Sequence, residues 1–277
     1  MADVPSIAAS ADVAHAPEPA RDDPTAGALD VLRDIVRGGL AGLIVGIVVA
    51  GIGGRLVMRL AALLVPGADG AVTENGNRVG DITLEGTLAL IIFIGLFFGV
   101  AVGALWVTIR AFLPRSAMAR AAVSVPIALA LGTSGLIDPR NRDFAILGND
   151  PLVVASLVIL VGLFGPALVL VEGWLEPRLA RPASGDRRTI TVFAVLAAIG
   201  LFLFVVAVIP LYFGPRLRLV GISLVVVGVA TLVTWFARIN DRAIPAWALV
   251  VGRVGLVAVV VAGMAAVLPD VADVLDR

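Results

Sequence analysis

Two arginines, Arg55 and Arg59, stand four residues apart in the otherwise apolar stretch GIGGRLVMRLAALLVPG, residues 51–67. A guanidinium group is always charged and presents five N–H donors, so its chemistry is the binding of carboxylates, phosphates and other anions. A spacing of four places both side chains on one face of a helix. The pair is therefore the leading candidate for a site that holds an anionic group.

The composition predicts the environment of this pair. The chain has 277 residues, of which 60% are hydrophobic, and its mean hydropathy is +1.04. Soluble domains are closer to about 45–50% apolar, and several runs here exceed the roughly 18 apolar residues that cross a bilayer as a helix. We therefore expect an all-α, polytopic transmembrane helix bundle whose partner is the lipid bilayer. All basic residues except His15 are arginine, which together with abundant Ala, Val, Gly and Leu suggests a GC-rich bacterial genome and the plasma membrane.

Apolar periodicity and length predict about seven membrane spans within a helical domain of residues 31–277. Their approximate bounds are 38–60, 87–109, 121–137, 151–171, 190–212, 219–236 and 245–268. The third is the shortest and carries Pro126. Residues 1–30 are rich in Ala, Pro and Asp and lack an apolar core, so we expect a disordered cytoplasmic tail there.

The arginines in the predicted connections indicate an orientation, because cytoplasmic loops carry an excess of Arg and Lys. One side has eleven: Arg33, Arg37, Arg110, Arg115, Arg120, Arg178, Arg181, Arg187, Arg188, Arg238 and Arg242. The other side has six: Arg78, Arg140, Arg142, Arg216, Arg218 and Arg277. The sequence thus predicts an inner N-terminus and an outer C-terminus. If the third span did not cross, every later span would be inverted.

This orientation gives the arginine pair its context near the outer edge of the first span. Helical side chains tilt toward the helix N-terminus, so Arg55 and Arg59 point back toward the membrane and favour buried partners. The candidate partners are acids of the predicted outer loops: Glu74, Asp81, Glu85, Asp138 and Asp143. Three interpretations stay open, namely structural ion pairing, anchoring at the interface and a ligand site.

Small residues also recur every four positions in the first two spans. The first contains Gly38, Gly42, Gly46, Ala50 and Gly54, and the second contains Gly95, Gly99 and Gly103. Such stripes let the backbones of membrane helices approach closely. We expect the first span to pack on the second within one chain, with a homo-oligomer contact as the alternative.

Several chemistries lack the residues they need. The chain has no lysine for a Schiff base, no cysteine, and its one histidine, His15, lies in the predicted tail. We therefore expect no haem, no metal site, no other cofactor and no enzymatic activity. No acidic residue lies deep in a predicted span, which argues against a proton relay. The net charge is zero, which gives no electrostatic reason to expect a nucleic-acid partner.

Three stretches, GGRLVMRLAALLVPG, TENGNRVGDITLEGTL and IDPRNRDF, resemble an uncharacterised family of bacterial multi-pass membrane proteins over about residues 38–145. The resemblance implies a membrane helical fold and no residue roles. We expect a small transporter, channel or lipid-handling protein with an outer-face site for an anionic group near Arg55 and Arg59. The alternative is a non-catalytic membrane subunit that binds another envelope protein through its outer loops.

Overall fold

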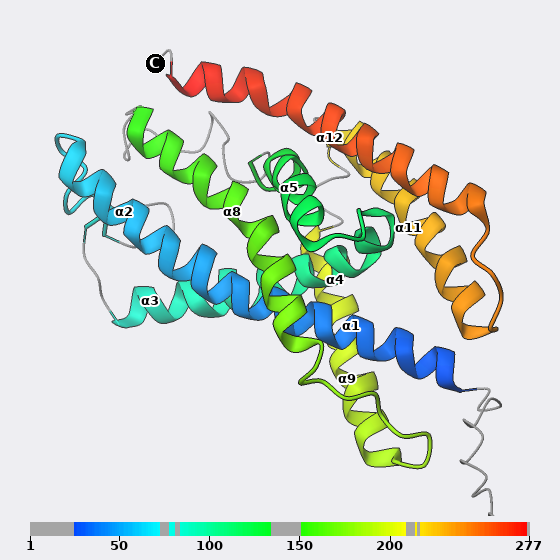
Figure 1. Cartoon of the computed structure of the whole chain (residues 1–277). Helices are drawn as coiled ribbons and strands as arrows, with labels where there is room; N and C mark the ends of the chain where they lie inside the picture. The colour runs from blue at the N-terminus through cyan, green and yellow to red at the C-terminus, as the bar shows by residue number, and fades with distance from the viewer. Residues whose placement is uncertain are drawn as a thin grey trace, which may run out of the picture.

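The structure is a computed structural model, which describes residues 25–72, 78–80, 84–133, 151–208, 214 and 217–275. The described chain is helical (Figure 1), apart from turns and one antiparallel β-bridge between Val72 and Arg78. That bridge flanks Asn75 and Gly76, where the sequence suggests a hairpin turn, although residues 73–77 lie outside the described chain.

The first half of the chain forms three helical rods. The first rod is continuous over Ala26–Leu64, and it consists of α1 (Ala26–Val45), the π-helical η1 (Gly46–Ile52) and α2 (Gly53–Leu64). The second consists of α3 (Leu84–Leu90), the π-helical η2 (Ile91–Phe98), α4 (Gly99–Ile109) and the 3-10 turn η3 (Arg110–Phe112). The third consists of α5 (Ala117–Ala128) and the π-helical η4 (Leu129–Thr133).

Four further rods complete the bundle. They are α8 (Pro151–Leu175), α9 (Arg187–Leu203) extended by the π-helical η5 (Phe204–Val208), α11 (Arg218–Ile239) and α12 (Ala246–Leu275). Six rods in the described chain are long and apolar enough to cross a membrane. The seventh, Ala117–Thr133, is a shorter apolar helix. Its 17 residues span roughly 25 Å, slightly less than the apolar core of a bilayer.

The first rod is longer than the predicted first span of 38–60. It begins at Ala26, inside the segment 1–30 that the sequence predicts to be a disordered tail. Leu29 and Val31 are both buried, and burial of these side chains stabilises the first turns of the helix against the bundle. The prediction of a tail up to residue 30 is wrong for residues 26–30, and residues 1–24 lie outside the described chain.

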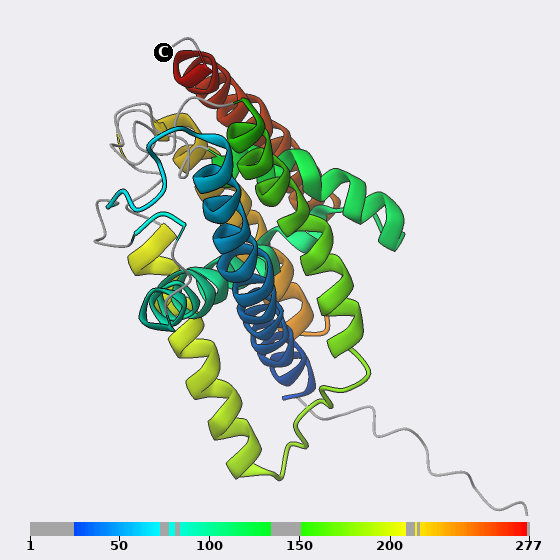
Figure 2. The ribbon, with the colours of Figure 1, turned by 90° about the vertical axis from the view of Figure 1, so that its left-hand side faces the viewer.

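Successive rods run in alternating directions, so the bundle has two ends. The Asp34 end contains the starts of α1, α5, α9 and α12 together with the ends of α4, α8 and α11, and the Arg55 end lies opposite. Figures 1 and 2 show α1 and α2 as one long rod through the bundle, with α9 at its edge. The main core lies between α1, α4, α8, α11 and α12.

The glycine stripes bring the first two rods together. A Cβ atom added to Gly42 would lie 2.6 Å from the Cα of Gly103, and one added to Gly46 would lie 2.6 Å from the carbonyl oxygen of Gly95. Gly38 and Gly99 take part in the same contact. This face of α1 is therefore occupied by α4 and η2 of the same chain.

The stripe ends earlier than the sequence predicts. A Cβ atom on Gly54 would meet no atom of the described residues within 4 Å, and Ala50 lies in η1, where its side chain is half-buried. The i→i+5 bonding of a π-helix changes the rotation per residue, so residues after Gly46 turn away from the glycine face. The inclusion of Gly54 in the predicted contact is wrong for this reason.

Candidate functional site

Arg55 is a buried cation without a partner in the described part of the chain. The residue is 7% exposed, and neither Nε nor Nη2 of its guanidinium group has a hydrogen-bond partner. Burying an ionised group without a partner costs several kcal/mol. The arginine therefore presents N–H donors that an anionic group could satisfy.

Apolar packing holds the helix that carries Arg55. Val57 and Ala61 of α2 are buried in a cluster with Val153 and Leu157 of α8. Val274 near the end of α12 belongs to the same cluster. Because α2 packs against α8 through this cluster, the position of the Arg55 backbone depends on residues far from it in sequence.

Arg59 has a different environment on the same helix. It is exposed, and its Nη1 donates a hydrogen bond of 2.8 Å to the carbonyl oxygen of Gly80. Gly80 has a φ of +88°, a left-handed conformation that favours glycine. The two predicted site arginines thus differ in their contacts, since Arg59 ties the first connection to α2 and Arg55 has no partner among the described residues.

The structure does not describe most of the acids expected to face this pair. Glu74, Asp81, Asp138 and Asp143 lie outside the described residues, and Glu85 lies in α3 with an undescribed side chain. Among the described residues, no ion pair involves Arg55 or Arg59. Pairing between these arginines and the outer acids stays a prediction.

Other unusual features gather toward the Arg55 end. The hydroxyl group of Thr133, at the end of η4, is buried without a described partner. The two longest π-helical segments, η1 and η2, pack against each other, and η1 directly precedes the helix that carries Arg55. Short π-helical segments are rare and often occur at functional sites. Their position beside α2 is therefore a second reason to consider this region a candidate site.

A second charged site, at the Asp34 end, is buried between four helices. We call it the ionic cluster, and its members are Asp34, Arg37, Arg110, Glu172, Glu176 and Arg238. Arg37 lies 3.2 Å from Asp34 and 3.3 Å from Glu172. Arg110 pairs with both of these acids. The cluster therefore joins residues of α1, η3, α8 and α11.

The outer members complete a balanced set of three cations and three anions. Arg238 Nη1 donates to Asp34 over 2.9 Å, and Arg37 Nη1 lies 3.4 Å from the exposed Glu176. The indole of Trp106 donates to the second oxygen of Glu172 over 2.8 Å. Glu172 is only 4% exposed, so these contacts offset the cost of burying its charge.

Sequence reasoning missed this cluster. It placed Arg37, Arg110 and Arg238 in short connections and found no acid deep in a span. The helices are longer than the predicted spans, because α1 begins before residue 34 and α8 continues to Leu175, and this brings Asp34 and Glu172 into the packed bundle. The spacing of Asp34 and Arg37, three residues apart on a helix, was the available signal.

Further contacts at the Asp34 end resemble those of a membrane interface. Arg33 donates to the carbonyl oxygens of Leu179 and Glu176 just after α8, over 2.6 and 2.7 Å. The guanidinium of Arg178 lies 4.3 Å from the ring centre of Trp174. Each of the four tryptophans lies near the end of a helix on this side: Trp106, Trp174, Trp235 and Trp247. Tryptophan is enriched where helices leave the apolar core of a membrane.

The chain was compared with protein-family models, curated proteins and solved structures. No family model, curated protein or solved structure matches the chain.

Proposed function

We propose that this protein is a small transporter, channel or lipid-handling protein of a membrane, with a binding site for an anionic group at Arg55. The observation that carries the proposal is the buried guanidinium of Arg55, which has two nitrogens without described partners. An anion bound there would supply the acceptor oxygens that these two nitrogens lack in the described protein. Charged residues at membrane depth are by default candidates for function.

The nature of the anion follows from the chemistry of arginine. A guanidinium group matches the geometry of a carboxylate or phosphate, because it can donate two parallel hydrogen bonds. A lipid head-group phosphate and free inorganic phosphate share this chemistry. Arg59 lies one turn farther along the same helix, where it would guide an anion toward Arg55 while holding the connection at Gly80.

The proposal is tested by the thermal unfolding midpoint of the purified full-length protein in detergent. Phosphatidylglycerol, phosphatidylcholine and inorganic phosphate are added separately, since a ligand that binds only the folded state raises the midpoint. A ligand at 100 times its Kd would stabilise the folded state by about 2.7 kcal/mol. We expect an anionic probe to raise the midpoint of the wild type. Arg55→Gln should abolish the rise with phosphate and reduce the rise with phosphatidylglycerol.

The matched control is Arg253→Gln, which removes an exposed arginine of α12 and should leave the rise intact. A response to phosphatidylglycerol alone would assign lipid handling, and a response to phosphate would assign a small-anion site. Phosphate flux into proteoliposomes then separates transport from binding. Equal midpoints for the wild type with and without every anion would contradict the proposal and favour a non-catalytic membrane subunit.

A further inference from the structure

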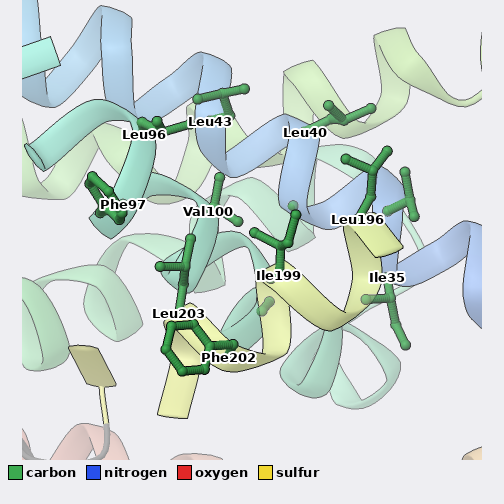
Figure 3. Close-up of a pocket in the computed structure, with 14 residues that line it drawn as sticks. Ile35, Leu40, Leu43, Leu96, Phe97, Val100, Leu196, Ile199, Phe202 and Leu203 are labelled. Carbon is green, nitrogen blue, oxygen red and sulfur yellow. The ribbon is translucent and has the colours of Figure 1, made fainter. Parts of the chain in front are cut away.

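An apolar groove lies between α1, η2, α4 and α9 (Figure 3), and Arg55 is not among the residues that line it. Its volume is about 480 Å³, within the roughly 300–1,000 Å³ of small-molecule pockets. Side chains from three helices point toward one another across it. Those that define its walls are Ile35, Leu40, Leu43, Phe97, Leu196 and Ile199.

Two glycines make the floor of the groove. Among the described residues, Cβ atoms placed on Gly39 and Gly200 would each find only Val100 nearby, at 3.9 and 3.7 Å. The absence of side chains at these two positions leaves the space between α1 and α9 unfilled. Both helices are long and apolar enough to cross a membrane, so this space would open onto lipid tails.

Helix α9 is attached weakly to the rest of the bundle. Its apolar stretch is 11% buried, whereas the other five long helices are 33–44% buried. Figure 2 shows its first turns extending away from the neighbouring helices. The packing of α9 therefore leaves much of its apolar surface, including the groove wall, for a partner that is itself apolar.

The charged residues at the start of α9 indicate which apolar partner fits. Arg187 and Arg188 are exposed, and neither side chain has a hydrogen bond or ion pair within the described residues. Arg188 precedes Ile199 by eleven residues, which is about three helical turns, so both lie on one helix face. Leu196, the nearest wall residue of α9, lies eight residues or roughly 12 Å along the axis from Arg188.

One acid lies beside these arginines and is already engaged. Asp186 caps α9 by accepting hydrogen bonds from the hydroxyl and the backbone N–H of Thr189, at 2.5 and 3.1 Å. These hydrogen bonds, the one from the hydroxyl above all, lower the pKa of the Asp186 carboxyl group. Its oxygens are directed to the helix start, which leaves the Arg188 guanidinium for an external anion.

We propose that this groove binds one acyl chain of an anionic phospholipid, whose phosphate is held by Arg188. The apolar walls would accept the chain, and the arginine lies at the end of the groove where a head group would sit. Each cationic side chain near a membrane surface contributes about 1 kcal/mol to attraction of anionic lipid. This site is separate from Arg55 and does not depend on the function proposed above.

The test is native mass spectrometry of the full-length protein after delipidation and addition of phosphatidylglycerol or phosphatidylcholine. We expect the wild type to retain one molecule of phosphatidylglycerol in preference to phosphatidylcholine. Gly200→Leu should abolish this retention by filling the groove, and Arg188→Gln should weaken it by about fivefold. Arg188→Gln changes an exposed side chain without described contacts, so it tests the site even if Gly200→Leu fails to fold.

Two matched controls separate this site from general lipid contact. Gly173→Leu adds the same side chain at an exposed position of α8 with nothing within 4 Å, and Arg55→Gln removes the other proposed anion site. Gly173→Leu should retain the lipid as the wild type does, and Arg55→Gln should still retain one molecule of phosphatidylglycerol. Equal retention of the two lipids by the wild type, or undiminished retention by Gly200→Leu, would overturn the proposal. A wild-type dimer that Gly200→Leu separates would assign the groove to a second copy and overturn it as well.

Discussion

Arg37 and Arg55 are carried by the same continuous helix and have the same exposure, 7% each. Eighteen residues separate them, or about 27 Å along the axis, which is close to the thickness of the apolar core of a bilayer. Arg37 has three acidic partners, Asp34, Glu172 and Glu176. Arg55 has none among the described residues. Two arginines of equal exposure on one helix therefore differ in whether described acids pair with them.

The comparison separates the burial of a charge from its pairing, because two arginines of equal exposure differ in their described partners. In the ionic cluster, acids from α1 and α8 compensate the arginines, so removing one member would leave the others buried and unpaired. At Arg55 the described residues supply no compensating acid, so removal of the charge should relieve a cost. The two sites should therefore respond to substitution with opposite signs.

The largest expected effect is an all-or-none difference in cysteine labelling between the Arg55 end and the Asp34 end of the bundle. Because the natural chain has no cysteine, single cysteines at Asn75, Asn141 and Ser184 can be labelled in intact cells with a membrane-impermeant maleimide. We expect labelling at 75 and 141 and none at 184, which would place the Arg55 end outside and the ionic cluster inside. Opposite results for 75 and 141 would mean that the third helix does not cross.

The next largest effect is expected at the centre of the ionic cluster. Glu172→Gln removes the carboxylate that pairs with Arg37 and Arg110 and leaves both cations undercompensated. Loss of one member of a buried pair costs about 3–5 kcal/mol, so the unfolding midpoint in detergent should fall strongly. Glu176→Gln, at a side chain that is 66% exposed, is the control and should change stability by less than about 1 kcal/mol. Similar midpoints for both variants would show that the cluster is not a structural element.

At Arg55 the change in stability should have the opposite sign. Arg55→Met replaces the unpaired cation with an apolar side chain, and in the absence of added anion this should stabilise the protein by about 1–4 kcal/mol, as replacement of buried ionic groups does elsewhere. The measurement is the unfolding midpoint of delipidated protein. A large loss of stability would instead show that Arg55 is paired, with the predicted outer acids as the first candidates.

A smaller effect on stability is expected at the glycine contact between α1 and α4, which lies between Arg37 and Arg55 along the first rod. Gly42→Ala would place a Cβ atom 2.6 Å from the Cα and 2.7 Å from the nitrogen of Gly103, and such overpacking costs about 1–3 kcal/mol. Gly54→Ala, which meets nothing within 4 Å, is the control and should stabilise the helix by up to about 1 kcal/mol. The comparison is made by chemical or thermal unfolding of both variants. Equal stabilities would argue that the helices do not approach through this face.

The sequence was informative about the helices because their signal is local. Apolar runs such as those of α8 and α12 identify helices directly, since burial of backbone polar groups in lipid requires internal hydrogen bonds. The ends were less certain, and α1 starts twelve residues before the predicted first span. Its first turns are stabilised by contacts with other helices, which a local pattern of apolar residues does not contain.

The candidate site was predicted only in part. The pattern of Arg55 and Arg59 drew attention to α2, yet their different surroundings depend on where Gly80 and the start of α8 lie. The ionic cluster was missed because its members looked like ordinary interfacial charges. The groove between α1 and α9 also had no local signature, because its glycines are separated by 161 residues (200 − 39).

The sequence by itself determined that this chain forms apolar helices suited to a membrane, because helix formation and lipid burial depend on composition over about 20 neighbouring residues. Only the tertiary structure decided which charges meet. Asp34 and Arg238 form an ion pair across 204 positions of sequence, and electrostatic energy depends on the distance between charges in space. For the same reason, only the assembled bundle distinguishes Arg37, with its three acidic partners, from Arg55, which has no acidic partner among the described residues.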